Sequence, residues 1–502
     1  MGNLPIGEYP VGFQTLFTHD LSKNAIPHSD WDGNLTQGHS SEKGRQFQIN
    51  VWYPAQAGSG DPLKYADYVD LMARQTNFGE SEEQTAFAKQ TFITQTRDLR
   101  NILETENEVV LSTEQLNQLL DLDVIARLNA KAEAGKYPVV VYPNGGSPAY
   151  QNITCEFLAS HGYVTVAFTP KGRFSSGMET STIGLELAVD DLEFVLGKIS
   201  EASNANMSQV SILANAISSS VGAAAVSRNE KIKALISLEG GLPSSFEQRL
   251  LNESVFYQPE NIRVPILFIY SPHPAIDPKH TFHLKYADRY YARFSKMSEF
   301  AMLNYGMFDE FIPDIIGAHS GNTKQGFETA NELVLRFLNQ KIKGESGALF
   351  EDTFITSREH IDTTFFLAGL PGPPNMAALK DAFWKEGFEA IEKIYQQLKS
   401  EGNTQAFSKE FYTDYRNWLA WKKDEDYAFR LRLYELAYDS YPESARVNYY
   451  LAYYSLKREL KEQAKRFYRQ TLLLVESDEN LSASEKSSIR TYASDELNSL
   501  IK

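Results

Sequence analysis

The chain has 502 residues, of which 42% are hydrophobic and 23% are charged, and its formal net charge at pH 7 is −16. This length predicts two or three domains. The charge argues against nucleic-acid binding, which requires a basic face. No stretch approaches the roughly 20 consecutive apolar residues that a membrane span requires.

The N-terminus and the cysteine content bear on the compartment of the protein and on the sites that it can form. The opening MGNLPIGEYP has neither the basic start nor the apolar stretch of an export signal. We therefore expect a cytoplasmic protein, or an exported one from which a signal was removed. The single cysteine, Cys155, rules out a disulfide framework and a cysteine-based zinc site. The sequence has no evident cofactor-binding motif, so we expect no cofactor.

The first predicted elements are a strand and a helical insert. Residues 47–54 alternate apolar and polar side chains and end in a proline, as a strand does. From about 75 to 134 the apolar residues recur at helical spacing, for example over 116–122. This spacing predicts two or three amphipathic helices.

Five apolar runs follow, separated by turns and helices. They cover residues 139–142, 163–168, 210–213, 234–238 and 266–270. Continuous runs of this length are typical of strands that are covered on both faces. Helices are predicted at 187–199 and 325–341, and a last strand near 301–303. This alternation predicts an α/β fold with a doubly wound, mostly parallel sheet.

The alternation stops over residues 344–375, which end in Leu-Pro-Gly-Pro-Pro and which we interpret as a linker. The sequence therefore predicts an α/β domain over residues 1–343 and an all-helical region over residues 376–502.

The turn after the 210–213 strand is the expected place for a nucleophile elbow, G-x-S-x-G. An elbow needs small residues on both sides, because the turn is strained and a helix packs closely against the strand. It also needs a central serine that attacks the substrate. Residues 214–219 read Ala-Asn-Ala-Ile-Ser-Ser. The small flanks are present, but Ala216 stands where the serine is required.

Four segments resemble the platelet-activating factor acetylhydrolase and dienelactone hydrolase group of α/β-hydrolases. GEYPVGF at 7–13 is similar to the N-terminal signature of that group, and VWYPA at 51–55 to its first-strand motif. LASHGYV at 158–164 resembles its LASHGYVV segment, and KIKALISL at 231–238 resembles its IKAVVSLD strand. The resemblance covers about residues 5–343 and implies an α/β-hydrolase fold.

The resemblance also implies which positions form the site. The group's elbow, G-H-S-x-G-G, places the nucleophile position at Ala216 and ligand-binding positions at Asn215, Ile217 and Ser218. The acid of the triad ends the next strand, at Glu239, and a glutamate can orient a histidine.

The histidine of the group has no counterpart. The G-x-x-H-x-x-F region resembles residues 305–311, which puts Phe308 at the position of the base, or Tyr305 in a shifted alignment. The oxyanion turn is Asn144-Gly145-Gly146, whose backbone N–H groups remain able to bind a ligand. Loss of both the serine and the histidine argues against ordinary serine-hydrolase catalysis.

Several residues have both a catalytic and a structural interpretation. Ser218 and Ser220 could act as nucleophiles, or could satisfy free N–H groups at the start of a helix. His319 could act as a base, or could be an exposed loop histidine. Glu239 could act as a general acid or base without a serine, or could be a leftover acid at the end of a strand.

A cluster of His273, Asp277, His280 and His283 is compatible with zinc binding. Solvated histidines on a helix after Pro278 explain the pattern equally well, so no metal is predicted.

The C-terminal region resembles tetratricopeptide repeats. The match covers about one and a half repeats, at Tyr434, Ala437, Pro442, Leu451, Ala452, Ala464 and Tyr468. Arg430 and Thr471 depart from the pattern, which has small residues at their positions. Fewer than three repeats are not normally stable alone, so we expect this layer to pack on the α/β domain. Such arrays present concave surfaces to peptides or partner proteins.

Three functions remain open, and whether the chain is an enzyme remains open with them. The first is a pseudo-hydrolase that binds a small ester-like or acyl ligand, or a partner protein. The second is an active ester or lactone hydrolase of carboxylesterase type, with a non-standard nucleophile or a water activated by Glu239 or His319. The third is a protein-interaction module that acts through the repeats. The preserved glycine turn, acid and helical insert favour the first.

Overall fold

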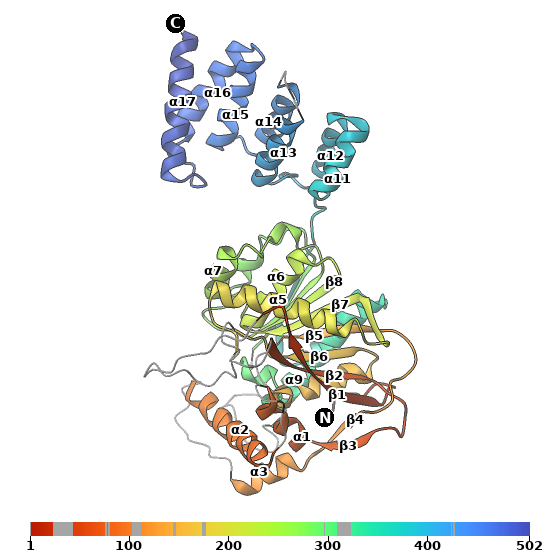
Figure 1. Cartoon of the computed structure of the whole chain (residues 1–502). Coiled ribbons are helices and arrows are strands. Elements are labelled where there is room, and N and C mark those ends of the chain that lie inside the picture. Colours follow the sequence, from red (N-terminus) through yellow and green to blue (C-terminus); the bar gives the residue numbers. More distant parts are fainter. Residues whose placement is uncertain are drawn as a thin grey trace. The chain divides into compact units, whose positions relative to one another are not determined.

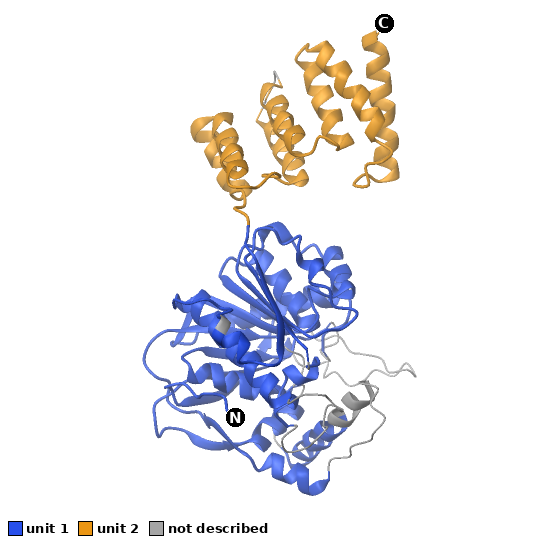
Figure 2. Ribbon diagram, turned by 180° about the vertical axis from the view of Figure 1, so that it is seen from behind, with its two compact units in different colours: residues 1–369 blue, residues 370–502 orange. Residues whose placement is uncertain are grey.

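The computed structural model describes residues 2–23, 44–75, 78, 81–102, 112–143, 147–172, 177–295, 297–308, 323–422, 424 and 427–501. The chain forms two compact units, Met1–Gly369 and Leu370–Lys502 (Figure 2). Each unit is described by itself.

Unit 1 contains a single large sheet in the described part of the chain. Its eleven strands lie in the order β11-β10-β9-β8-β7-β5-β6-β2-β1-β4-β3. The strands are β1 (Val11–Asp20), β2 (Arg45–Pro54), β3 (Asp61–Lys64), β4 (Asp123–Leu128), β5 (Tyr137–Tyr142), β6 (Val164–Phe168), β7 (Ala205–Asn215), β8 (Ile232–Leu238), β9 (Ile266–Tyr270), β10 (Arg289–Phe294) and β11 (Ile361–Leu367).

The centre of the sheet is parallel. The six successive strands β10, β9, β8, β7, β5 and β6 are all parallel to one another. Antiparallel pairing occurs between β2 and β6, between β1 and β2, between β3 and β4, and between β10 and β11. The predicted mostly parallel sheet is therefore confirmed.

Both faces of the sheet are buried, as the apolar runs predicted. Val139 and Val141 belong to one hydrophobic cluster, while Val140 and Tyr142 belong to the other, because successive side chains of a strand point to opposite faces. Helices α5 (Thr182–Ile199) and α6 (Ile217–Arg228) contribute to one cluster, and α4 (Asn152–Ser160) and α9 (Thr323–Leu338) to the other (Figure 1).

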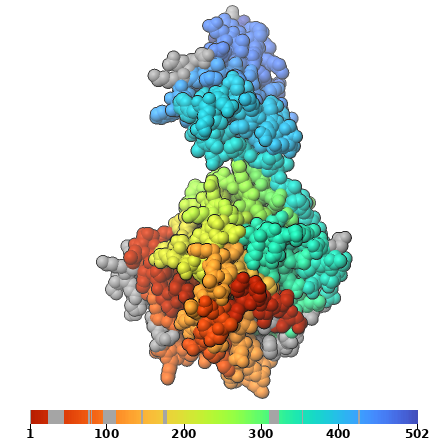
Figure 3. All heavy atoms as spheres, turned by 90° about the vertical axis from the view of Figure 1, so that its right-hand side faces the viewer, coloured from red at the N-terminus to blue at the C-terminus, as the bar shows by residue number. Residues whose placement is uncertain are grey.

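The insert is helical only in part. Helices α2 (Glu82–Ile102) and α3 (Thr113–Leu120) lie inside it, but residues 123–128 form β4 rather than a helix. β4 pairs with β1, so its position is set by a sheet partner that lies more than a hundred residues earlier in the chain. Figure 3 shows the result, with the N-terminal residues in red beside the segments in orange. The remaining helices of unit 1 are α1 (Tyr65–Asp70), α7 (Ser245–Glu253), α8 (Tyr305–Phe308) and α10 (Asp352–Thr356).

The prediction of a strand near 301–303 was wrong. Residues Phe300–Met302 form a 3₁₀ helix, and the strand that pairs with β9 is β10. β10 reads RYYARF and carries two arginines, so it lacks the continuous apolar run that marked the other central strands.

Residues 344–375 are also not a simple linker. β11 lies within them and pairs with β10, where Phe365 stacks on Tyr291 with ring centroids 4.2 Å apart. Unit 1 therefore ends at Gly369, later than the sequence indicated.

Unit 2 is helical throughout its described residues and has a hydrophobic core of its own. Its helices are α11 (Met376–Glu386), α12 (Phe388–Ser400), α13 (Lys409–Trp421), α14 (Ala428–Ser440), α15 (Ala445–Lys457), α16 (Lys461–Leu474) and α17 (Ala483–Ile501). Across both units, none of the described helices is both long enough and apolar enough to cross a membrane.

Candidate functional site

The turn between β7 and α6 has the geometry of a nucleophile elbow. Ala216, its central residue, has φ 48° and ψ −132°, a conformation that residues with a side chain rarely adopt. Its N–H donates to the carbonyl oxygens of Leu238 (2.9 Å) and Glu239 (2.8 Å). The end of β8 therefore holds the strained turn in place.

Two glycines lie at points of close packing around the elbow. A Cβ on Gly222 would lie 2.8 Å from Leu235 Cδ1, so α6 packs tightly on β8 at this point. Gly241 has φ 65°, and a Cβ there would lie 2.4 Å from Ser219 Cβ and 2.8 Å from Ala216 O. The Gly240-Gly241 pair was missed in the sequence, although two glycines directly after the acid position are a signal of close backbone approach.

The serines after the elbow lie inside the first turn of α6. Ser218, Ser219 and Ser220 are buried, and the Ser219 hydroxyl donates to the Ala214 carbonyl at 3.1 Å. The N-cap is Ala216, and no side chain caps this helix. The interpretation of these serines as helix caps was therefore wrong, because the elbow residue itself occupies the cap position.

The two other predicted elbow positions differ in exposure. Asn215 is buried, and its Nδ2 has no hydrogen-bond partner among the described residues. Ile217 is half-buried. Both residues flank Ala216 on the edge of the sheet where the parallel strands end, which is where ligand sites form in folds of this kind.

Glu239 follows β8 and lies on the same edge of the sheet. Only 2% of its surface is exposed, and its Oε1 has no hydrogen-bond partner in the described part of the chain. Burial raises the pKa of its carboxyl to about 7, while interactions with the side chain and backbone of Ser271 oppose the rise. Ser271 follows β9, a position that the sequence did not single out.

Phe308 lies in a buried aromatic cluster. Its ring centroid is 5.3 Å from that of Tyr65 and 6.0 Å from that of Tyr305. Tyr305 in turn stacks on Tyr150 at 5.4 Å. The segment is anchored by Asn304, whose Nδ2 donates to Asn152 Oδ1 at 2.6 Å. An apolar ring packed in this way has no capacity for proton transfer.

Four predicted site residues, Asn144, Gly145, Gly146 and His319, lie outside the described residues.

The residues of the possible zinc cluster have separate hydrogen-bond partners. His283 Nε2 lies 2.7 Å from the Tyr257 hydroxyl, and His280 Nδ1 lies 3.0 Å from the Pro243 carbonyl. His273 Nδ1 accepts from the Ala275 N–H at 3.2 Å. Residues 278–281 form a 3₁₀ helix, so the α-helical spacing assumed for His280 and His283 does not apply. Within the described ranges no group of three or more possible ligands gathers around one point.

The parallel sheet and the strained turn between β7 and α6 define unit 1 as a domain of the α/β-hydrolase fold. No family model matches the sequence. No curated protein matches it either.

The solved structures to which this chain is similar include an esterase and two peptidases. A ferulic acid esterase from Streptomyces cinnamoneus matches with 15% identity over 70% of this chain and 95% of its own, with a TM-score of 0.47. An acylaminoacyl peptidase from Pyrococcus horikoshii matches with 16% identity over 44% of this chain and 40% of its own, with a TM-score of 0.34. A puromycin-hydrolyzing peptidase from Mycobacterium tuberculosis matches with 15% identity over 43% of this chain and 35% of its own, with a TM-score of 0.32.

Proposed function

We propose that this chain is a pseudo-hydrolase of the platelet-activating factor acetylhydrolase and dienelactone hydrolase group, which binds a small ester-like or acyl ligand at the elbow without hydrolysing it. The observation that carries the proposal is the backbone of Ala216. It keeps the strained elbow conformation, which positions a nucleophile, on a residue that has no nucleophilic atom.

The position of the base supports the same proposal. Serine-hydrolase chemistry needs a residue that removes the hydroxyl proton and later returns it to the leaving group. Phe308 is buried among aromatic rings and cannot do either. In this proposal the nucleophile and the base of the triad are both replaced by apolar side chains.

Glu239 favours the alternative of an active ester or lactone hydrolase. A buried carboxyl with a pKa of about 7 and an unpartnered oxygen among the described residues has the properties of a general base that activates water. In this alternative Glu239, or His319, replaces the serine and histidine together.

Turnover of short-chain p-nitrophenyl esters tests the proposal. We compare the natural chain with Ala216→Ser, Phe308→His and the double variant, and use Ala223→Ser in the same helix as the matched control. The pseudo-hydrolase proposal predicts that the natural chain and the control are inert and that the double variant gains activity. If the natural chain turns over the esters, and if Glu239→Gln or His319→Ala abolishes that turnover, the alternative of an active hydrolase is established instead.

For unit 2 we propose a tetratricopeptide-like array that contacts a peptide or a partner protein. The proposal rests on the repeat positions in the sequence and on buried aromatic packing between successive helices. Tyr434 and Tyr454, for example, lie in α14 and α15 with ring centroids 5.7 Å apart. Loss of a partner on deletion of unit 2, but not on Ala216→Ser, would distinguish this function from ligand binding at the elbow.

A further inference from the structure

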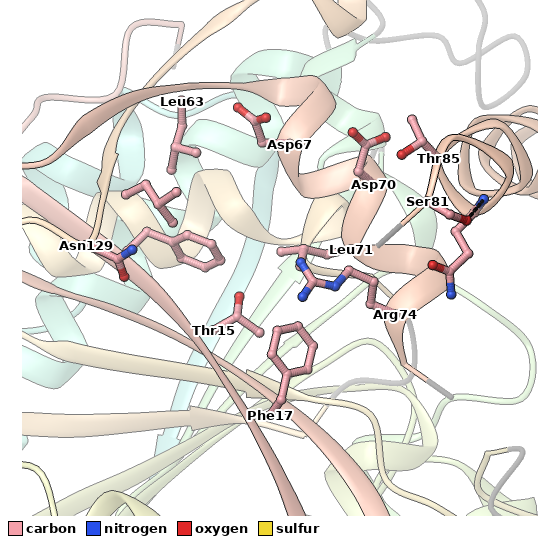
Figure 4. A pocket seen from close by; sticks show the side chains of 13 residues that line it. Thr15, Phe17, Leu63, Asp67, Asp70, Leu71, Arg74, Ser81, Thr85 and Asn129 are labelled. Carbon is pink, nitrogen blue, oxygen red and sulfur yellow. Dashed lines mark hydrogen bonds between the residues drawn. The ribbon is translucent and has the colours of Figure 1, made fainter. Parts of the chain in front are cut away.

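Unit 1 contains a cavity, with a volume of about 320 Å³, that shares no residue with the elbow. It lies between β1, α1 with the 3₁₀ turn that follows it, the start of α2 and the end of β4 (Figure 4). A cavity of this size fits a small metabolite.

One wall of the cavity is apolar. It consists of Phe13, Phe17, Leu63, Leu71 and Leu128. Phe13 and Leu63 are also part of the hydrophobic core, so this wall is rigid. It offers a surface for an aliphatic or aromatic group of a ligand.

The polar lining carries charges of both signs. Asp67 and Asp70 project from α1, and Arg74 from the turn that follows it, so that the two carboxylates lie on one side of the cavity and the guanidinium on the other (Figure 4). Asp67 Oδ2 accepts from the Lys64 N–H at 2.7 Å. The Arg74 guanidinium lies 4.3 Å from the centroid of the Phe17 ring. Arg74 Nη2 also donates to the Phe78 carbonyl at 3.4 Å. These contacts hold the side chains of Asp67 and Arg74 in position before any ligand binds.

Asn129 closes the end of the cavity opposite Ser81 and Thr85 (Figure 4). It has φ 52°, and its N–H donates to the Phe13 carbonyl at 2.8 Å. A left-handed non-glycine residue costs free energy, and such residues gather at functional sites. Its amide adds a group that can both donate and accept hydrogen bonds.

We propose that this cavity binds a small zwitterion of the α-amino acid type with an apolar side chain. The ammonium group lies against Asp67 and Asp70, the carboxylate pairs with Arg74, and the side chain contacts the apolar wall. Arginine and carboxylate groups match in geometry, and their charge-assisted hydrogen bonds are the strong ones. Two carboxylates against one guanidinium disfavour phosphates and other ligands of purely negative charge.

Isothermal titration of the full chain with three matched ligands tests the proposal. L-leucine carries both charges, N-acetyl-L-leucine lacks the ammonium, and L-leucinamide lacks the carboxylate. At about pH 6.5 the free amines are protonated. We expect L-leucine to bind, and both blocked forms to bind at least about tenfold more weakly, since each loses a charge-assisted contact. Equal binding of L-leucinamide would indicate a site for cations or peptide N-termini and would overturn the proposal, as would no binding of L-leucine.

Substitutions of two residues that line the cavity test whether L-leucine binds there. Asp67→Asn keeps an acceptor for the Lys64 N–H but loses the charge, and Arg74→Gln removes the guanidinium. Each is expected to weaken L-leucine binding by about tenfold. The matched controls are Asp61→Asn, an exposed acid outside the cavity, and Arg249→Gln, whose guanidinium also lies over a phenylalanine ring, that of Phe246. Binding that survives both cavity variants would overturn the proposal, and the ligand series on the natural chain decides it even if Arg74→Gln fails to fold.

Discussion

Ala216 occupies a backbone conformation that its own Cβ opposes. We predict that Ala216→Gly raises the free energy of unfolding by about 1 kcal/mol, because glycine adopts this φ without strain. Ala223→Gly in the regular part of α6 is the control and should lower it by about 1 kcal/mol. Urea unfolding of the three chains measures both changes. Destabilisation by the first variant would mean that the turn is not strained.

Glu239 links the stability of the fold to pH. Its folded-state pKa of about 7 lies above the ordinary value of 4.5, so the folded state binds the proton more tightly than the unfolded state does. The resulting contribution to stability is complete below pH 4.5 and is lost as the pH rises through about 7.

Glu239→Gln removes this pH dependence, because glutamine stays neutral. We predict that the variant exceeds the natural chain in free energy of unfolding by about 1–3 kcal/mol near pH 8, and that the difference disappears near pH 4. Denaturant unfolding at the two pH values measures it, with the exposed Glu230→Gln as the control. A difference that is equal at both pH values would show that the carboxyl is not buried as described.

The place of the tight turn between β7 and α6 could be predicted from the sequence, because small flanks after a buried strand leave little choice of local geometry. The neighbours of Glu239 could not. Ser271 meets the site only because β8 and β9 are adjacent in the sheet, and that adjacency is a tertiary fact. The burial of Phe308 against Tyr65 depends in the same way on a segment that is distant in the sequence, α1.

At the scale of elements, the central strands with continuous apolar runs were predictable, and the strands toward the two ends of the sheet were not. β4 and β11 mix polar with apolar residues and are only partly buried, so their pairing partners define them. Because β11 was not predicted, the sequence placed the end of the α/β domain at residue 343, whereas unit 1 ends at Gly369.

We predict that a chain ending at residue 369 folds cooperatively and that one ending at residue 343 does not. The shorter chain loses β11, which exposes the hydrogen-bonding edge of β10 and the faces of Tyr290 and Tyr291 that stack on Phe366 and Phe365. Soluble yield and thermal unfolding by circular dichroism compare the two. Equally cooperative unfolding of the two chains would show that the α/β domain does not need β11 in order to fold.

At the scale of the whole molecule, two units with separate cores predict two unfolding transitions. Unit 2 buries aromatic residues such as Tyr395, Tyr412 and Tyr434 within its own helices. We predict that residues 370–502 alone are helical and unfold cooperatively, and that the full chain shows the sum of the two separate transitions in calorimetry. The sequence led us to expect that the helical layer depends on the α/β domain, and a shift of more than a few degrees between the isolated and the linked unit would support that expectation instead.

The central claim is that unit 1 keeps a hydrolase elbow from which the chemistry has been removed. Reaction with an alkyl fluorophosphonate, followed by mass spectrometry of the peptide that contains position 216, tests it most directly. The natural chain should form no adduct on that peptide, and the double variant Ala216→Ser with Phe308→His should form a stoichiometric adduct at position 216. An adduct on the natural chain at Ser218 or Ser220, or no adduct on the double variant, would contradict the claim.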